Sequence, residues 1–141
     1  CFHVLFLMQK YIKLEPHPTA TRGVPGNNLI PGNRRRAGKS MGFKQAAEIF
    51  DVLGDGESIK IATHSMGSAY GKGFIQGLRK YAKENNIDIS DRIEFEVDLA
   101  PFQPTHQEAQ AGVPTTVIAH EGDPVAGSDP MPGANNRVVL K

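Results

Sequence analysis

One stretch near the middle of the chain, from Ile59 to Gly77, constrains the fold more than any other. It contains a short apolar run, a polar turn around Ser65 and a helix-like pattern rich in glycine. This order predicts a strand that turns sharply into a helix. A serine at such an elbow is strained, its hydroxyl stands clear of the sheet, and the next backbone N–H groups face the same space. We therefore interpret Ser65 as a candidate nucleophile and the N–H of Met66 as an oxyanion donor.

A simpler explanation of Ser65 is that it only caps the helix and satisfies one free N–H group of the first turn. The strand before it and the helix after it favour the elbow. An elbow also needs small residues two positions before and after the serine, and Gly67 meets that need while Thr63 meets it poorly. We therefore expect crowding at Thr63. A second oxyanion donor is expected from the loop after the first strand, where no single residue stands out.

Size and charge limit the class of protein. The 141 residues are 39% hydrophobic, which suits one soluble domain with its own core. A formal charge of +1 gives no long-range field that favours nucleic acid or an anionic membrane. The apolar run at residues 2–8 is far too short for a membrane span. The single cysteine, Cys1, excludes an internal disulfide and leaves the compartment, cytoplasmic or secreted, unknown.

Strands and helices alternate along the chain. We expect a strand within 2–14, a proline- and glycine-rich loop at 15–38, a helix at 40–53 capped by Ser40, a strand at 59–63, a helix reaching Lys83, and strands at 93–99, 115–119 and 137–140. The alternation predicts an α/β fold, a three-layer αβα sandwich whose mostly parallel sheet is covered on both faces. Because the chain starts at Cys1 and stops within an apolar run, we expect residues 1–141 to be one domain that is cut at both ends.

The segment from Arg34 to Ser40 ends in Gly-Lys-Ser, as a phosphate-binding loop does. The first glycine of that motif would fall at Asn33, and a proline-rich loop precedes it where the motif needs a strand. We therefore interpret the segment as a solvated basic stretch that leads into a helix.

Three polar sites follow strand ends: Ser65, Asp98 and the segment from His120 to Asp123. Ligands of parallel sheets bind at this edge, so we expect the three sites to converge. Residue order alone allows a triad of Ser65, Asp98 as the acid and His120 as the base. The same side chains lack the ligand spacing of a metal site, so we expect no metal and no cofactor.

Two motifs resemble those of known enzymes. THSMGSA, which starts at Thr63, resembles the GHSLGGA elbow of lipase-like α/β hydrolases. HEGDPVAGSDPMPG, which starts at His120, resembles the segment of fungal-type (class 3) lipases that supplies the triad acid. More narrowly, RRRAGKSMGFKQAAEIF, IKIATHSMGSAYGKG and VDLAPFQPT together resemble lipase-like domains at the ends of bacterial RHS-repeat proteins. The resemblance covers residues 41–132.

This resemblance implies a partial α/β-hydrolase fold and a serine esterase that cleaves a small-molecule or lipid ester through an acyl-serine intermediate. It implies Asp123 as the acid and a histidine base after the strand at 137–140, beyond Lys141. The triad of Ser65, Asp98 and His120 stays open as the alternative. So does a second class of protein, an interaction or structural domain that keeps the sheet without catalysis, which Thr63 and the missing histidine favour.

Overall fold

A computed structural model describes residues 4–7 and 30–141 of the chain. Five strands form one sheet in the order β1 (Val4–Leu7), β2 (Ile59–His64), β3 (Ile93–Leu99), β4 (Thr115–His120) and β5 (Asn136–Leu140). The strands from β2 to β5 run parallel, while β1 pairs antiparallel with β2 at one edge. The predicted α/β class with a mostly parallel sheet is therefore confirmed.

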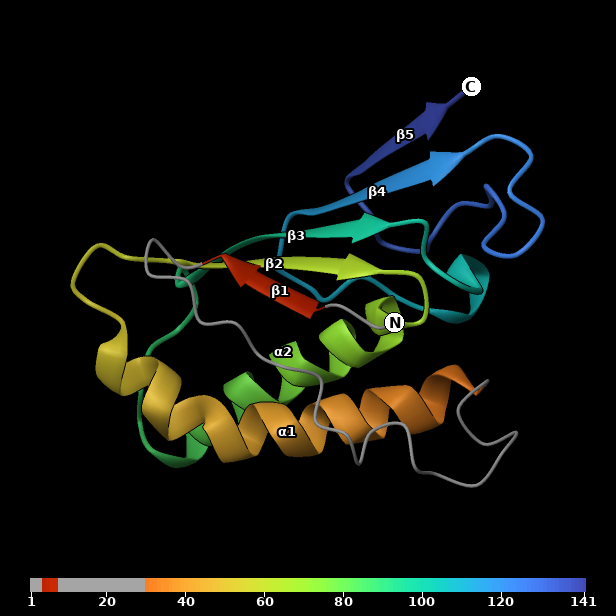
Figure 1. Ribbon diagram of the computed structural model, residues 1–141. Helices are drawn as coiled ribbons and strands as arrows, with labels where there is room; N and C mark the ends of the chain where they lie inside the picture. Colours follow the sequence, from red (N-terminus) through yellow and green to blue (C-terminus); the bar gives the residue numbers. More distant parts are fainter. Residues whose placement is uncertain (1–3, 8–29) are drawn as a thin grey trace.

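Two long helices, α1 (Pro31–Val52) and α2 (Gly67–Glu84), lie on the same side of the sheet (Figure 1). The second helix, α2, follows β2 and lies between the sheet and α1. Within the described ranges no helix covers the opposite face, so the second helical layer of the expected αβα sandwich is not seen in this part of the chain. A short 3-10 helix, η3 (Pro104–His106), follows β3.

The first helix starts earlier than expected. We predicted a loop at 15–38 and a cap at Ser40, but α1 begins at Pro31, and the expected loop is wrong from there on. Proline fits the first helical turn because the N–H group that it lacks has no intrahelical acceptor there. Residues 15–29 lie outside the described ranges. The Gly-Lys-Ser sequence falls in the helix interior, where backbone N–H groups bond within the helix rather than to a phosphate.

Glycines allow the backbones of α1 and α2 to touch. Each helix carries a pair of glycines four residues apart: Gly38 and Gly42 on α1, Gly73 and Gly77 on α2. A Cβ atom at Gly38 would lie 2.0 Å from the carbonyl oxygen of Tyr70, and one at Gly73 would lie 1.9 Å from that of Arg35. Both helices therefore require glycine where they cross.

The main core lies between the sheet and the two helices. Its members are apolar side chains of β2, α2 and the second half of α1, among them Ile59, Ile61, Phe74, Ile75, Leu78, Ala46 and Ile49. Alternate residues of β2 point to this core, as the sequence predicts. The predicted strands from 59 onward, and the end of α2, agree with the structure to within one residue. Neither long helix of the described residues is apolar enough to cross a membrane.

Candidate active site

Ser65 lies in a strained turn between a parallel strand and a helix. The strand β2 ends at His64 and α2 begins at Gly67, so two residues make the turn. Ser65 has a φ of 55°, in the left-handed region that residues other than glycine rarely adopt. The predicted strand-to-helix elbow is therefore present, with its strain at the serine.

Backbone hydrogen bonds from the end of β3 hold this strained residue in place. The N–H of Ser65 donates to the carbonyl oxygen of Leu99 at 2.9 Å, and the carbonyl oxygen of Ser65 accepts from the N–H of Phe102 at 3.1 Å. The Ser65 hydroxyl makes no capping hydrogen bond to α2. Its oxygen has no hydrogen-bond partner among residues 30–141, so the simpler explanation as a helix cap is not supported.

The N–H of Met66 is placed to act as an oxyanion donor. Met66 stands at the N-terminus of α2, where the first N–H groups have no intrahelical acceptor and the helix dipole favours negative charge. Within the described part of the chain its N–H has no acceptor. The second donor, expected in the loop after the first strand, falls outside the described residues.

Thr63 fits two positions before Ser65 because the helix supplies the missing space. A Cβ atom at Gly71 of α2 would lie only 2.5 Å from Cγ2 of Thr63. The threonine methyl group therefore occupies the space that a side chain at position 71 would need. The expected crowding at Thr63 is relieved, and its hydroxyl is free to donate to the carboxylate of Asp98.

Asp98 and His120 lie apart, on opposite faces of the sheet. Asp98 is fully buried on the face that α2 covers, and its two carboxylate oxygens accept from Thr63 and Lys72. His120 belongs to the other set of alternating β4 side chains, is exposed, and has Nδ1 2.7 Å from the carbonyl oxygen of Glu121. The structure thus does not assemble the acid and the base of the alternative triad.

Asp123 follows β4 at the carboxyl edge of the sheet. Its Oδ1 accepts the N–H groups of Val125 at 2.8 Å and Ala126 at 3.0 Å, which leaves Oδ2 without a partner among residues 30–141. These bonds, from Ala126 first and Val125 second, lower the pKa of the Asp123 carboxyl, and the nearby imidazoles of His120 and His64 lower it further. Asp123 is therefore an ionised carboxylate, close to two imidazoles, in a turn that fixes one of its oxygens.

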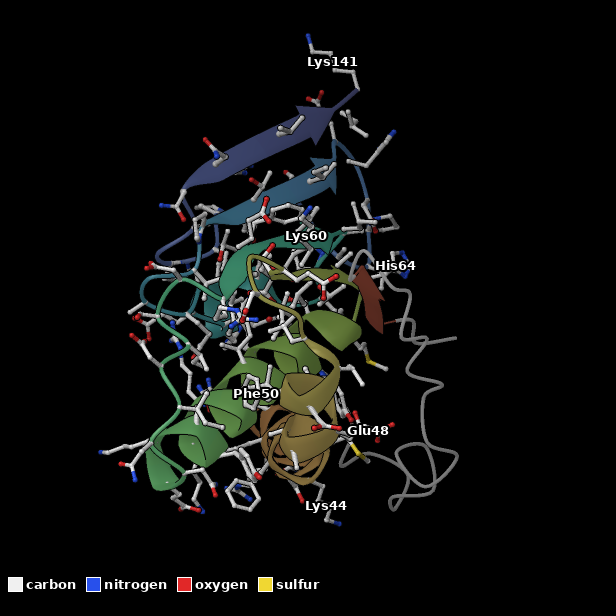
Figure 2. All side chains as sticks on the ribbon, turned by 90° about the vertical axis from the view of Figure 1, so that its left-hand side faces the viewer. Lys44, Glu48, Phe50, Lys60, His64 and Lys141 are labelled. Carbon is white, nitrogen blue, oxygen red and sulfur yellow. The ribbon has the colours of Figure 1, made fainter. Side chains whose placement is uncertain are left out.

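His64 ends β2 on the exposed set of alternating side chains. Its ring projects clear of both helices at the side of the molecule (Figure 2). The alternation of β2 thus places His64 on the face away from the core. It is adjacent to Ser65 in sequence, but no hydrogen bond joins it to the serine within the described ranges.

The loop after β3 packs against the elbow, which the sequence did not predict. Gln107 is buried, accepts from the hydroxyl of Ser68 at 2.6 Å and donates to the carbonyl oxygen of Phe102 at 2.8 Å. Two other residues of this loop, Ala100 and Gln103, have φ values of 44° and 56°. Together with Ser65 they concentrate strained backbone at the carboxyl edge of the sheet, as is common at functional sites.

Arg34 of α1 also reaches the elbow. Its Nη1 lies 3.5 Å from Sδ of Met66, and its guanidinium carbon lies 5.5 Å from the ring centroid of Phe102. Burial lowers the pKa of the Arg34 guanidinium. The basic stretch was expected to be solvated, which is wrong for Arg34. The signal that could have found it is its spacing of four residues from Gly38, on the buried stripe of α1.

The site is defined by its geometry alone. No three His, Cys, Asp or Glu side chains of residues 4–7 and 30–141 are grouped so that they could hold a metal ion. Comparison of the chain with protein-family models, curated proteins and solved structures finds no match. Fold and site together define an α/β protein with a strained serine at the carboxyl edge of a parallel sheet.

Proposed function

We propose that this chain is a lipase-like serine hydrolase that cleaves carboxylic esters through an acyl-serine intermediate. The observation that carries the proposal is the φ of 55° at Ser65, between a parallel strand and a helix N-terminus. Strain of this kind is maintained when a side chain must be presented outward, as a nucleophile elbow does. The motif resemblance to lipase-like α/β hydrolases, and more narrowly to RHS-associated domains, agrees with this geometry.

In the proposed reaction the Ser65 oxygen attacks the ester carbonyl carbon while a histidine base takes its proton. The carbonyl oxygen becomes an oxyanion beside the N–H of Met66. The base then gives the proton to the departing alkoxide, which leaves as the alcohol. Water attacks the acyl-serine in the same way, releases the carboxylic acid and returns the proton to Ser65.

Asp123 is proposed to orient the base, carried by the segment after β5. The strands β4 and β5 are parallel, and His120 pairs with Leu140 at their ends. Both strands therefore end at the carboxyl edge of the sheet, and Lys141 lies beyond the outermost strand β5, far from both helices (Figure 2). A histidine in the segment after Lys141 would start from the edge where Asp123 follows β4, and Oδ2 of Asp123 has no partner among residues 30–141.

The alternative is an interaction or structural domain that keeps this fold without catalysis. The observation that favours it is that no imidazole of the described residues forms a hydrogen bond with Asp123, whose Oδ1 is already used by the backbone of its own turn. In that case the strained serine would have no chemical role.

A fluorophosphonate probe separates the two proposals. The experiment uses the native protein, with whatever residues its gene encodes beyond Lys141, and mass spectrometry to locate the phosphonylated residue. The hydrolase predicts one modified serine, Ser65, and no labelling in Ser65→Ala. Ser40→Ala, an exposed change on α1, is the matched control and should label like the wild type. No labelling of the folded native protein would support the non-catalytic domain.

A further inference from the structure

A cluster of charged side chains is buried beside the strand that carries the elbow. It consists of Lys72 of α2 with Glu96 and Asp98 of β3, whose side chains are 1%, 0% and 0% exposed. The Lys72 Nζ atom lies 2.9 Å from Oε2 of Glu96 and 2.5 Å from Oδ2 of Asp98. One cation thus faces two carboxyl groups in the interior of a small domain.

The attraction within such a cluster adds little stability once the free energy lost by removing its charges from water is subtracted. Removing charges from water costs several kcal/mol for each ion, and well-packed apolar replacements of buried ion pairs are often as stable or more stable. Burial raises the pKa of Glu96 to about 7, with Lys72 opposing the change and Asp98 adding to it. Stability alone therefore does not account for three charged residues here, and their geometry has to be considered.

The hydrogen bonds of Asp98 connect β2 and α2, the strand and the helix on either side of the Ser65 elbow. One oxygen of Asp98 accepts from the hydroxyl of Thr63 on β2, and the other accepts from Lys72 on α2. Thr63 and Asp98 are also register partners in the parallel sheet. The next residue of β3, Leu99, accepts the N–H of Ser65. A displacement of Asp98 would thus change the positions of the strand, the helix and the backbone acceptor of the nucleophile.

We propose that Thr63, Asp98 and Lys72 are positioning residues that fix β2 against α2 and so hold the Ser65 elbow in its strained conformation. This inference rests on the proposed function, because a positioned nucleophile has a purpose only in a reaction. It assigns a role to Thr63, where the related elbows carry glycine: the residue supplies the hydroxyl that connects the strand to Asp98, and Gly71 supplies the space.

The first test needs no catalysis. Amide hydrogen exchange, followed by NMR, reports on two N–H groups of the elbow: that of Ser65 donates to the Leu99 carbonyl oxygen, and that of Phe102 donates to the Ser65 carbonyl oxygen. In Thr63→Val, which keeps the shape and removes the hydroxyl, both amides should exchange at least about tenfold faster than the change in global stability explains. Thr63→Ser, which restores a hydroxyl, should bring the rates back toward the wild type. Asp98→Asn should act like Thr63→Val, and Lys72 then retains Glu96 as its counter-charge.

Ile59→Val is the matched control, because Ile59 is buried in the core on the same strand and its register partner on β3 is Ile93, outside the charged cluster. It should speed exchange only as far as the protein is destabilised overall. The positioning role is refuted if, in Thr63→Val and Asp98→Asn as well, the exchange rates at Ser65 and Phe102 rise only as much as the loss of global stability explains.

The second test is the rate of Ser65 phosphonylation. A displacement of about 1 Å at a reacting group can lower a rate about 100-fold, so Thr63→Val should be labelled at least about tenfold more slowly, with rescue by Thr63→Ser. An unlabelled wild type would defeat the proposed hydrolase, while the exchange data would still decide whether the cluster holds the elbow. Normal labelling of Thr63→Val would overturn the positioning role and leave the hydrolase standing.

Discussion

Ser65 shows how a single residue can hold a conformation that its own chemistry opposes. A non-glycine residue in the left-handed region costs on the order of 1–3 kcal/mol, and it persists only where its surroundings determine it. Here those surroundings are the Leu99 carbonyl, the Phe102 amide and the fit of Thr63 against Gly71. None of these partners lies next to Ser65 in sequence, so the strain is supported by tertiary structure.

Glu96 makes stability depend on pH. Its pKa in the fold is raised to about 7 from an ordinary 4.5, so the folded state binds this proton more tightly than the unfolded state. The resulting stabilisation is complete below about pH 4.5 and is lost as pH rises through about 7. Relative to Glu96→Gln, which cannot titrate, the wild type should lose roughly 3 kcal/mol of unfolding free energy between pH 4.5 and pH 8.

Urea denaturation of both proteins at several pH values measures this difference. Because groups outside the cluster titrate equally in the two proteins, the difference between their curves isolates the titration of Glu96 together with its neighbours Lys72 and Asp98. If the unfolding free energies of the two proteins stay parallel from pH 4.5 to pH 8, Glu96 keeps an ordinary pKa and burial does not raise it.

At the level of elements, the contact between α1 and α2 depends on glycine. A Cβ atom at Gly73 would overlap the Arg35 carbonyl oxygen, and backbone cannot move aside as a flexible side chain can. Gly73→Ala should therefore lower the free energy of unfolding by about 2 kcal/mol or more, although alanine favours the helix itself. The control is Gly32→Ala in the first turn of α1, where an added Cβ meets no atom of the described residues within 4 Å; it should raise stability by up to about 1 kcal/mol.

Chemical denaturation of the two variants compares the effects directly. Equal stabilities would mean that the helices do not meet backbone to backbone at Gly73. Both substitutions improve helix propensity. A loss of stability in Gly73→Ala together with a gain in Gly32→Ala would therefore show that the loss comes from the crossing of the two helices.

The strands were predictable because their alternation and their bounding glycines and prolines are local signals. The start of α1 was not, because the prolines and glycines that break most helices are tolerated at Pro31, in the first turn, and required at Gly38, where α2 crosses. The candidate site likewise has features that local sequence predicts and features that depend on the tertiary fold. The turn at Ser65 follows from a short motif, whereas Thr63 with Gly71, and Asp98 with Lys72, depend on which residues the fold brings together.

At the scale of the whole molecule, the parallel sheet places candidate site residues from distant parts of the chain at one edge. Ser65 follows β2, the loop that holds its backbone follows β3, and Asp123 follows β4, so three neighbouring strands deliver their ends to one edge (Figure 1). The parallel order predicted that Ser65, Asp98 and the segment from His120 to Asp123 converge at this edge, and the buried Asp98 does not join the other two. The sequence did not predict that Asp98 would turn inward, because the face on which a strand residue lies depends on register.

This arrangement makes Asp123 the carboxylate on which catalysis should depend. Asp123→Asn keeps the size of the side chain and removes the charge that would hold the base, so labelling of Ser65 in the native protein should slow by about 100-fold or more. Asp129→Asn, an exposed change in the same loop, should leave the rate within about threefold because surface charges act weakly. His120→Ala distinguishes the two triads. If the base follows β5, His120→Ala should be labelled at the wild-type rate. A fall in the labelling rate as large as that of Asp123→Asn would instead place the base at His120 and remove the need for a residue beyond Lys141.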